Sequence, residues 1–176
     1  TPVHVVPNVH RIRDPIPAFH ERKGIIFLGG YLHRPNVDAV EFFIEHVLPA
    51  VRGKLPGVPG SIAGGHPPDW FYERARRDQN LVVTGFVPDH RVLLDSHRVG
   101  IAPLRYGAGM KGKIGEYLAC GLPCVTTSIG AEGMALGHEP HVLVADDPAA
   151  FADATVRLYR EEALWRRFSE IGRAHV

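Results

Sequence analysis

The sequence predicts an α/β protein built on a doubly wound parallel sheet of about six strands, with helices on both faces. Three observations lead to this fold class. From residue 24 onward, short apolar runs alternate with stretches of helical periodicity. The apolar runs are continuous, as in parallel strands that are covered on both faces. Glycines gather directly after these runs, where strand-to-helix turns are made.

Six apolar runs are the expected strands, and they lie at 24–28, 58–63, 81–84, 99–102, 124–127 and 142–144. Helical patterns separate and follow them, at about 36–48, 69–77, 89–97, 112–121, 147–158 and 164–171. Polar residues mark several helix starts. Asn36, Asp89 and Asp147 are each expected to be N-caps, and Pro148 after Asp147 strengthens the last of these assignments.

The composition indicates a single domain of nearly neutral charge. The chain has 176 residues, and 20 Lys and Arg against 19 Asp and Glu give a formal charge of +1. No basic stripe is present, so nucleic acid is not expected as a partner. Neither a transmembrane run nor a signal peptide is recognised, which favours a cytoplasmic protein with reduced cysteines.

The two ends of the chain differ from its middle. Residues 1–23 combine a short leading strand at 3–6 with three prolines and little periodicity, as expected of an interdomain linker. Residues 24–176 carry the strand and helix alternation. We therefore expect a leading linker and one α/β domain, cut from a longer protein whose N-terminal domain is not part of this chain.

Topology predicts where a ligand binds. In a Rossmann-like sheet of order 3-2-1-4-5-6, the chain reverses direction between strands 1 and 4, and ligands occupy the crevice at that point. The loops that flank this crevice would carry Gly29 and Gly30 on one side and residues 107–112 on the other. These two loops are among the richest in glycine.

The second of these loops has the chemistry of an anion site. Gly107, Gly109 and Gly112 let the main chain approach a ligand closely, and a helix N-terminus follows them. Lys111 and Lys113 add two positive charges, so a phosphate or diphosphate is the expected ligand. Glu116, one turn further along the helix, can accept hydrogen bonds from sugar hydroxyls. Phosphate and diol together indicate a nucleotide or a nucleotide sugar.

An alternative interpretation uses the same glycines. They also fit G-x-G-x-x-G, which on its own is a weak signal for a dinucleotide-binding turn. That interpretation requires an acidic residue at the end of the next strand, about 20 residues on. The strand at 124–127 instead runs into Thr127 and Ser128, and only one further strand follows. Dinucleotide binding is therefore the second choice.

Four segments resemble the C-terminal, donor-binding domain of GT-B glycosyltransferases of the family-4 group. They are FLGGYLHRPNVDAV (27–40), VTGFVPD (83–89), APLRYGAGMKGKIGEYLACGLPCVTT (102–127) and GAEGM (130–134). The third segment is the most specific. The resemblance implies half of a GT-B fold, with the nucleotide sugar held by this domain and the acceptor by an N-terminal domain.

The resemblance also implies roles for individual residues. Glu116 matches the second Glu of the family's Glu, seven residues, Glu signature and would bind the ribose, whereas the first Glu is replaced by Ala108. The family's usual cations fall at Tyr31 and Asn36, so the diphosphate and donor sugar are assigned to the loops and to other cations, namely Gly29, Gly30, Arg105, Gly107, Gly109, Lys111, Gly112 and Lys113. The base would contact Gly85, Phe86 and Val87.

The function implied is a nucleotide-sugar-dependent, hexosyltransferase-type enzyme of polysaccharide biosynthesis. It would transfer a sugar from a UDP- or GDP-sugar to a glycan or lipid-linked acceptor, with no cofactor and no metal required, and peripheral membrane association of the parent protein is compatible with it. Catalytic residues are expected in the N-terminal domain, so this domain alone would be inactive. A non-catalytic nucleotide-binding module and a sugar-nucleotide epimerase of the same fold remain the alternatives.

Overall fold

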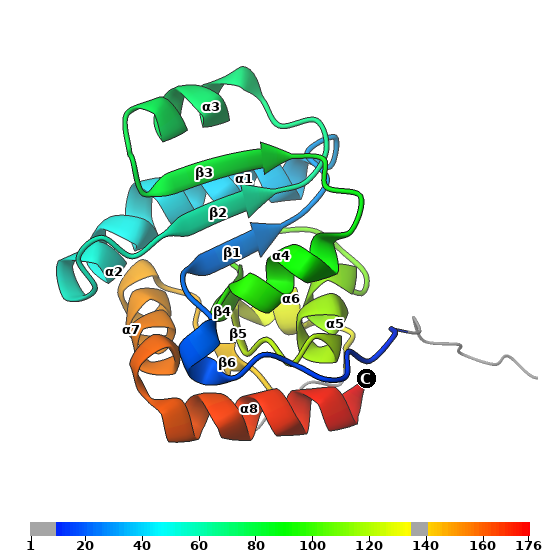
Figure 1. Ribbon diagram of the computed structural model, residues 1–176. Helices are drawn as coiled ribbons and strands as arrows, with labels where there is room; N and C mark the ends of the chain where they lie inside the picture. Colours follow the sequence, from blue (N-terminus) through cyan, green and yellow to red (C-terminus); the bar gives the residue numbers. More distant parts are fainter. Residues whose placement is uncertain (1–9, 135–140) are drawn as a thin grey trace, which may run out of the picture.

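The computed structural model describes residues 10–134 and 141–176. Its centre is a six-stranded sheet in the order β3-β2-β1-β4-β5-β6, in which every neighbouring pair is parallel (Figure 1). The strands are β1 (Ile25–Leu28), β2 (Gly60–Ala63), β3 (Leu81–Gly85), β4 (Val99–Ala102), β5 (Cys124–Thr126) and β6 (Leu143–Val144). The predicted fold class is confirmed, the strand order is the one usual for that class, and no strand end differs from the expected one by more than two residues.

Helices cover both faces of the sheet (Figure 1). They are η1 (Phe19–Glu21), α1 (Arg34–Phe42), η2 (Phe43–Val47), α2 (Leu48–Lys54), α3 (Asp69–Arg76), α4 (His90–Ser96), α5 (Gly112–Ala119), α6 (Ser128–Ala131), α7 (Pro148–Arg160) and α8 (Glu162–His175). Within the described residues no helix is both long and apolar enough to cross a lipid bilayer.

Strand β1 shows why continuous apolar runs form this sheet. Ile25 and Phe27 belong to one buried cluster, which includes side chains of α1, α2 and α7. Ile26 belongs to a second cluster, which includes side chains of α4 and α5. Successive residues of a strand point to opposite faces, so a strand covered on both faces must be apolar at every position.

Two of the three predicted helix caps are confirmed. Asp89 accepts a hydrogen bond from the backbone N–H of Arg91 at 3.1 Å, and Asp147 accepts one from Ala150 at 2.9 Å. Asn36 is not an N-cap. Helix α1 already begins at Arg34, because Pro35 is well suited to a first helical turn, and Asn36 lies inside that turn. Its side chain is consequently available for a different role.

The first long helical pattern is divided rather than continuous. A π-helical turn, η2, separates α1 from α2. Pro49, at the start of α2, has no N–H to donate to the carbonyl of Glu45, so the regular helical hydrogen bonding cannot pass through this point. The divided helix still buries an apolar face, because Phe43, Val47 and Leu48 all join the same core cluster.

The segment that precedes β1 is packed against the domain from residue 10 onward. The backbone N–H of Arg13 donates to the carbonyl of Ala119 at 2.8 Å, at the end of α5. Phe19 in η1 meets Trp165 of α8 edge to face, with ring centroids 5.7 Å apart. Arg22 is completely buried. The leading strand expected at 3–6 lies outside the described residues.

Candidate functional site

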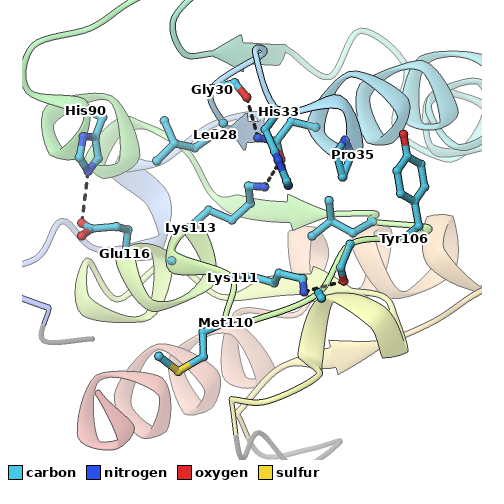
Figure 2. Close-up of a pocket in the computed structure, with 16 residues that line it drawn as sticks. Leu28, Gly30, His33, Pro35, His90, Tyr106, Met110, Lys111, Lys113 and Glu116 are labelled. Carbon is cyan, nitrogen blue, oxygen red and sulfur yellow. Dashed lines mark hydrogen bonds and ion pairs between the residues drawn. The ribbon is translucent and has the colours of Figure 1, made fainter. Parts of the chain in front are cut away.

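A cavity of about 350 Å³ opens at the carboxyl ends of β1 and β4, where the sheet topology predicts a crevice. Its size is within the range of small-molecule sites. The walls come from the loop after β1, the loop after β4 and the first residues of α1, α4 and α5 (Figure 2). They are formed by Leu28, Gly29, Gly30, His33, Pro35, Asn36, His90, Leu104, Tyr106, Gly107, Ala108, Met110, Lys111, Gly112, Lys113 and Glu116.

Lys113 reaches across this cavity from α5 toward the loop after β1 (Figure 2). Its Nζ donates to Oδ1 of Asn36 at 2.5 Å and lies 4.8 Å from the centroid of the Phe27 ring. Burial, aided by repulsion from Lys111, lowers the pKa of Lys113 to about 8. No carboxylate of the described residues forms an ion pair with this ammonium group, so its charge is uncompensated.

Lys111 fixes the glycine loop. Its Nζ donates to the carbonyl oxygens of Gly107 at 3.0 Å and Gly109 at 2.5 Å, and the side chain is only 9% exposed. Gly107 and Gly109 have φ angles of +119° and +82°, which residues other than glycine rarely adopt. The ammonium group therefore holds the loop in a glycine-dependent conformation, and its charge remains at the edge of the cavity.

Helix α5 presents its N-terminus to the cavity. It begins at Gly112, and no side chain caps it. The first backbone N–H groups of a helix have no partner within the helix and carry the positive end of its dipole. Together with Lys111 and Lys113, they make this end of the cavity strongly attractive to an anion.

Glu116 is the carboxylate of the cavity and is held by two histidines. His10 Nδ1 lies 3.0 Å from one carboxylate oxygen, and His90 Nε2 lies 3.2 Å from the other; Figure 2 shows the second of these contacts. Burial alone would raise the pKa of Glu116, but the hydrogen bonds and charge of these histidines outweigh it and lower the pKa below its usual value. Each carboxylate oxygen keeps a second lone pair that can accept a hydroxyl.

Two of the residues expected at the base, Phe86 and Val87, line a neighbouring hollow of about 230 Å³. Gly29 and His90 border both this hollow and the main cavity, so the two adjoin. Phe86 is 77% exposed, so it is not a core aromatic. Gly85, with φ of +67°, turns the chain at the end of β3.

Arg105 is placed differently from the other expected site residues. Its guanidinium makes two hydrogen bonds to Asp38 of α1, with Nε to Oδ2 at 2.9 Å and Nη2 to Oδ1 at 2.5 Å. The side chain is exposed and does not line the cavity. This ion pair joins the loop after β4 to α1. It therefore connects two walls of the cavity without facing the cavity itself.

Sequence reasoning gave no site role to several residues that border the cavity, among them His33, Asn36 and His90, whose side chains carry nitrogen atoms. His90 follows the cap residue Asp89 directly, and nothing in the local pattern shows that it meets Glu116. Asn36 carried a signal that was interpreted as a helix cap. Among the described residues, no cluster of three or more His, Cys, Asp or Glu side chains is suited to hold a metal ion.

The fold and this crevice define the chain as a Rossmann-like α/β domain. The chain belongs to the family "Glycosyl transferases group 1", whose model matches residues 22–161. A curated relative from Klebsiella pneumoniae, an "Uncharacterized 44.6 kDa protein in cps region", is 24% identical over 153 residues, which is 78% of this chain and 39% of that protein. The chain thus spans about two fifths of the length of this relative.

Two solved structures have the same fold. A mutant of S. aureus TarM, in complex with fondaparinux, alpha-GlcNAc-glycerol and UDP, gives a TM-score of 0.76 at 16% identity, covering 96% of this chain and 34% of that one. The C-terminal domain of LpcC, a glycosyl transferase group 1 family protein from Francisella tularensis, gives 0.67 at 17% identity, covering 92% of this chain and 86% of that one.

Proposed function

We propose that this chain is the donor-binding domain of a nucleotide-sugar-dependent glycosyltransferase, which transfers a sugar from a UDP- or GDP-sugar to a glycan or lipid-linked acceptor. The observation that carries the proposal is the partly buried ammonium of Lys113, without a carboxylate partner among the described residues, beside an uncapped helix N-terminus. A buried cation without an anionic partner is costly. A diphosphate in the cavity would compensate this charge.

The neighbouring groups support a complete nucleotide rather than a simple anion. Glu116 lies one helical turn beyond Lys113, a separation suited to a ribose next to a diphosphate. The hollow beside Phe86 and Val87 adjoins this position and offers an apolar surface to a base. UDP in the TarM complex is consistent with a nucleoside diphosphate as the ligand of this fold.

The cations would also contribute to the reaction. As the bond from the sugar to the diphosphate breaks, negative charge builds on the leaving group. Fixed positive charge from Lys111, Lys113 and the α5 N-terminus would stabilise that charge. We propose that an N-terminal domain binds the acceptor and supplies the catalytic residues. Residues 1–23 would then be the linker and residues 24–176 the donor domain.

Isothermal titration calorimetry of the chain against UDP, GDP, ADP, the three corresponding monophosphates and NAD tests the proposal. We expect one nucleoside diphosphate to bind more tightly than its monophosphate and more tightly than NAD. Tighter binding of NAD than of every nucleoside diphosphate would overturn it and favour a dinucleotide-binding domain. Salt screens the attraction between the phosphates and the cations of the site, so all titrations are made at the same ionic strength.

Replacing Glu116 by glutamine tests the ribose position. Glutamine retains the shape but loses the charge that strengthens hydrogen bonds to hydroxyls, so the affinity for the preferred nucleoside diphosphate should fall about tenfold. The 2′,3′-dideoxy analogue provides the matched control, because it lacks the hydroxyls and should bind both proteins equally. Equal loss for the two ligands would instead place the ribose away from Glu116.

A further inference from the structure

We propose that Asn36 is a positioning residue of the diphosphate site, which aims the ammonium group of Lys113 into the cavity and leaves its charge available to the ligand. The proposal rests on the proposed function, because it concerns the same cavity. It assigns a role to a residue on α1, whereas the cation that it holds comes from α5.

The contacts of Asn36 join the two walls of the crevice. Its Nδ2 donates to the carbonyl oxygen of Gly30 at 2.8 Å, and its Oδ1 accepts from Nζ of Lys113 at 2.5 Å. The residue is only 7% exposed, although it borders the cavity. Both ends of the amide are therefore used, one for the loop after β1 and the other for the cation.

Close packing fixes the amide in this orientation. A Cβ added to Gly29 would lie 2.9 Å from two side-chain atoms of Asn36, so a larger residue at position 29 would push the amide out of place. The amide of Asn36 donates to a carbonyl on one side and accepts from an ammonium on the other, whereas a carboxylate can only accept. The hydrogen bond to Gly30 thus sets which end of Asn36 faces Lys113.

The neutrality of Asn36 is as important as its shape. An aspartate at this position would accept from Lys113 equally well, but its negative charge would compensate the ammonium and repel an incoming diphosphate. The second oxygen of the aspartate would also face the carbonyl oxygen of Gly30, where the amide of Asn36 has its donor. The amide holds the ammonium without neutralising it, which is the arrangement that an anion-binding lysine requires.

Other charged and titratable groups line or adjoin the cavity that holds Lys113 and have to be considered in any titration. Lys111 is the cation on the adjacent loop, Glu116 is the anion one turn along α5, and histidines come from three other segments. These histidines are His10 before η1, His33 before α1 and His90 on α4. Both oxygens of Glu116 are engaged by His10 and His90, so its charge is partly satisfied away from Lys113.

The test combines a ligand-free titration with binding. The chain has four lysines, at positions 23, 54, 111 and 113, so the Lys113 signal in a lysine-labelled NMR spectrum can be assigned with the Lys113→Arg variant. In Asn36→Asp we expect the pKa of Lys113 to rise above its value in the unmodified chain, because a carboxylate favours the charged form. The UDP affinity at pH 7 should fall at least tenfold in calorimetry.

The matched control is Gln79→Glu, which makes the same amide-to-acid change at an exposed residue before β3, at the other end of the sheet. It should leave both the Lys113 titration and the UDP affinity unchanged. If Asn36→Asp does not fold, Asn36→Ala decides the question. Loss of the acceptor should then lower the pKa of Lys113 below that of the unmodified chain and weaken UDP binding severalfold.

The outcomes separate this inference from the proposed function. If the unmodified chain binds UDP and the Asn36 variants bind it equally well, Asn36 has no positioning role. An unchanged pKa of Lys113 in the folded Asn36 variants would also overturn the inference. If the unmodified chain binds no nucleoside diphosphate, the proposed function fails, and the ligand-free titration still decides whether Asn36 controls the charge of Lys113.

Discussion

Replacing Arg22 by methionine should lower the free energy of unfolding by about 3 kcal/mol, since methionine cannot replace the hydrogen bonds of the guanidinium. Arg22 is fully buried, and its partners are backbone carbonyl oxygens from three different parts of the chain. Nη2 donates to Cys120 at 2.9 Å, Nη1 to Leu94 at 3.1 Å and Nε to Pro17 at 3.2 Å.

The position of these carbonyls explains why a charge is tolerated there. Leu94 lies in the last turn of α4 and Cys120 follows the last residue of α5, so both oxygens are at the negative ends of helix dipoles. The Trp165 ring, with its centroid 5.4 Å from the guanidinium carbon, adds a cation–π contact. Methionine would leave these carbonyls buried without a donor, at a cost of about 1 to 3 kcal/mol each before relaxation.

Urea denaturation measures this effect, with Arg166→Met as the control. Arg166 is exposed and pairs with Glu162 at 2.7 Å within α8, and exposed pairs of this kind contribute about 0.5 kcal/mol or less. The Arg22 variant should therefore lose several times more stability than the Arg166 variant. Similar losses in the two proteins would mean that the buried network around Arg22 contributes little.

Replacing Lys113 by methionine should weaken UDP binding about 30- to 100-fold at pH 7, which corresponds to about 2 to 3 kcal/mol. Methionine keeps an apolar stem but removes the charged Nζ, which lies 4.8 Å from the centroid of the Phe27 ring and would face the proposed diphosphate. Calorimetry provides the measurement. Lys54→Met, which removes an exposed lysine paired with Asp153, is the control and should bind UDP as the unmodified chain does.

The same lysine predicts a pH dependence of binding. The pKa of Lys113 in the unliganded chain is about 8, so the ammonium is the main form at pH 7 and the neutral amine dominates at pH 9. Above pH 8, binding has to include proton uptake, so UDP affinity should fall by up to about tenfold for each pH unit. In Lys113→Arg the charge persists, and the fall between pH 7 and 9 should disappear. An equal fall in both proteins would assign it to another group.

The two alternative functions make different predictions. A nucleotide-binding module without chemistry of its own would bind nucleoside diphosphates equally well with or without the attached sugar. A sugar-nucleotide epimerase would convert the donor without an acceptor. The family to which the chain belongs favours glycosyl transfer over both. Assays of the full-length protein with a UDP- or GDP-sugar, with and without acceptor, distinguish the three functions.

Much of the fold could be predicted because it depends on local patterns. Strand β4 was expected at its observed residues, and the caps Asp89 and Asp147 have the predicted role. The helix break before α2 was missed. The hydrophobic periodicity continues through Pro49, although proline lacks the N–H that a regular helix requires. Asn36 was assigned to a cap on a frequent local pattern, whereas its partners are six and 77 residues away.

By itself, the sequence determined the parallel sheet and its two glycine loops, and the strand order usual for that fold class placed these loops at one crevice. Continuous apolar runs and turn glycines act over a few residues, and the handedness of strand crossovers then leaves few topologies. Only the tertiary structure decided the distribution of charges in the site. In the folded chain, Arg105 pairs with Asp38, Lys111 donates to a carbonyl of its own loop, and Lys113 donates to Asn36. Such pairings depend on distances between separate elements, and these distances exist only after the sheet and helices have packed.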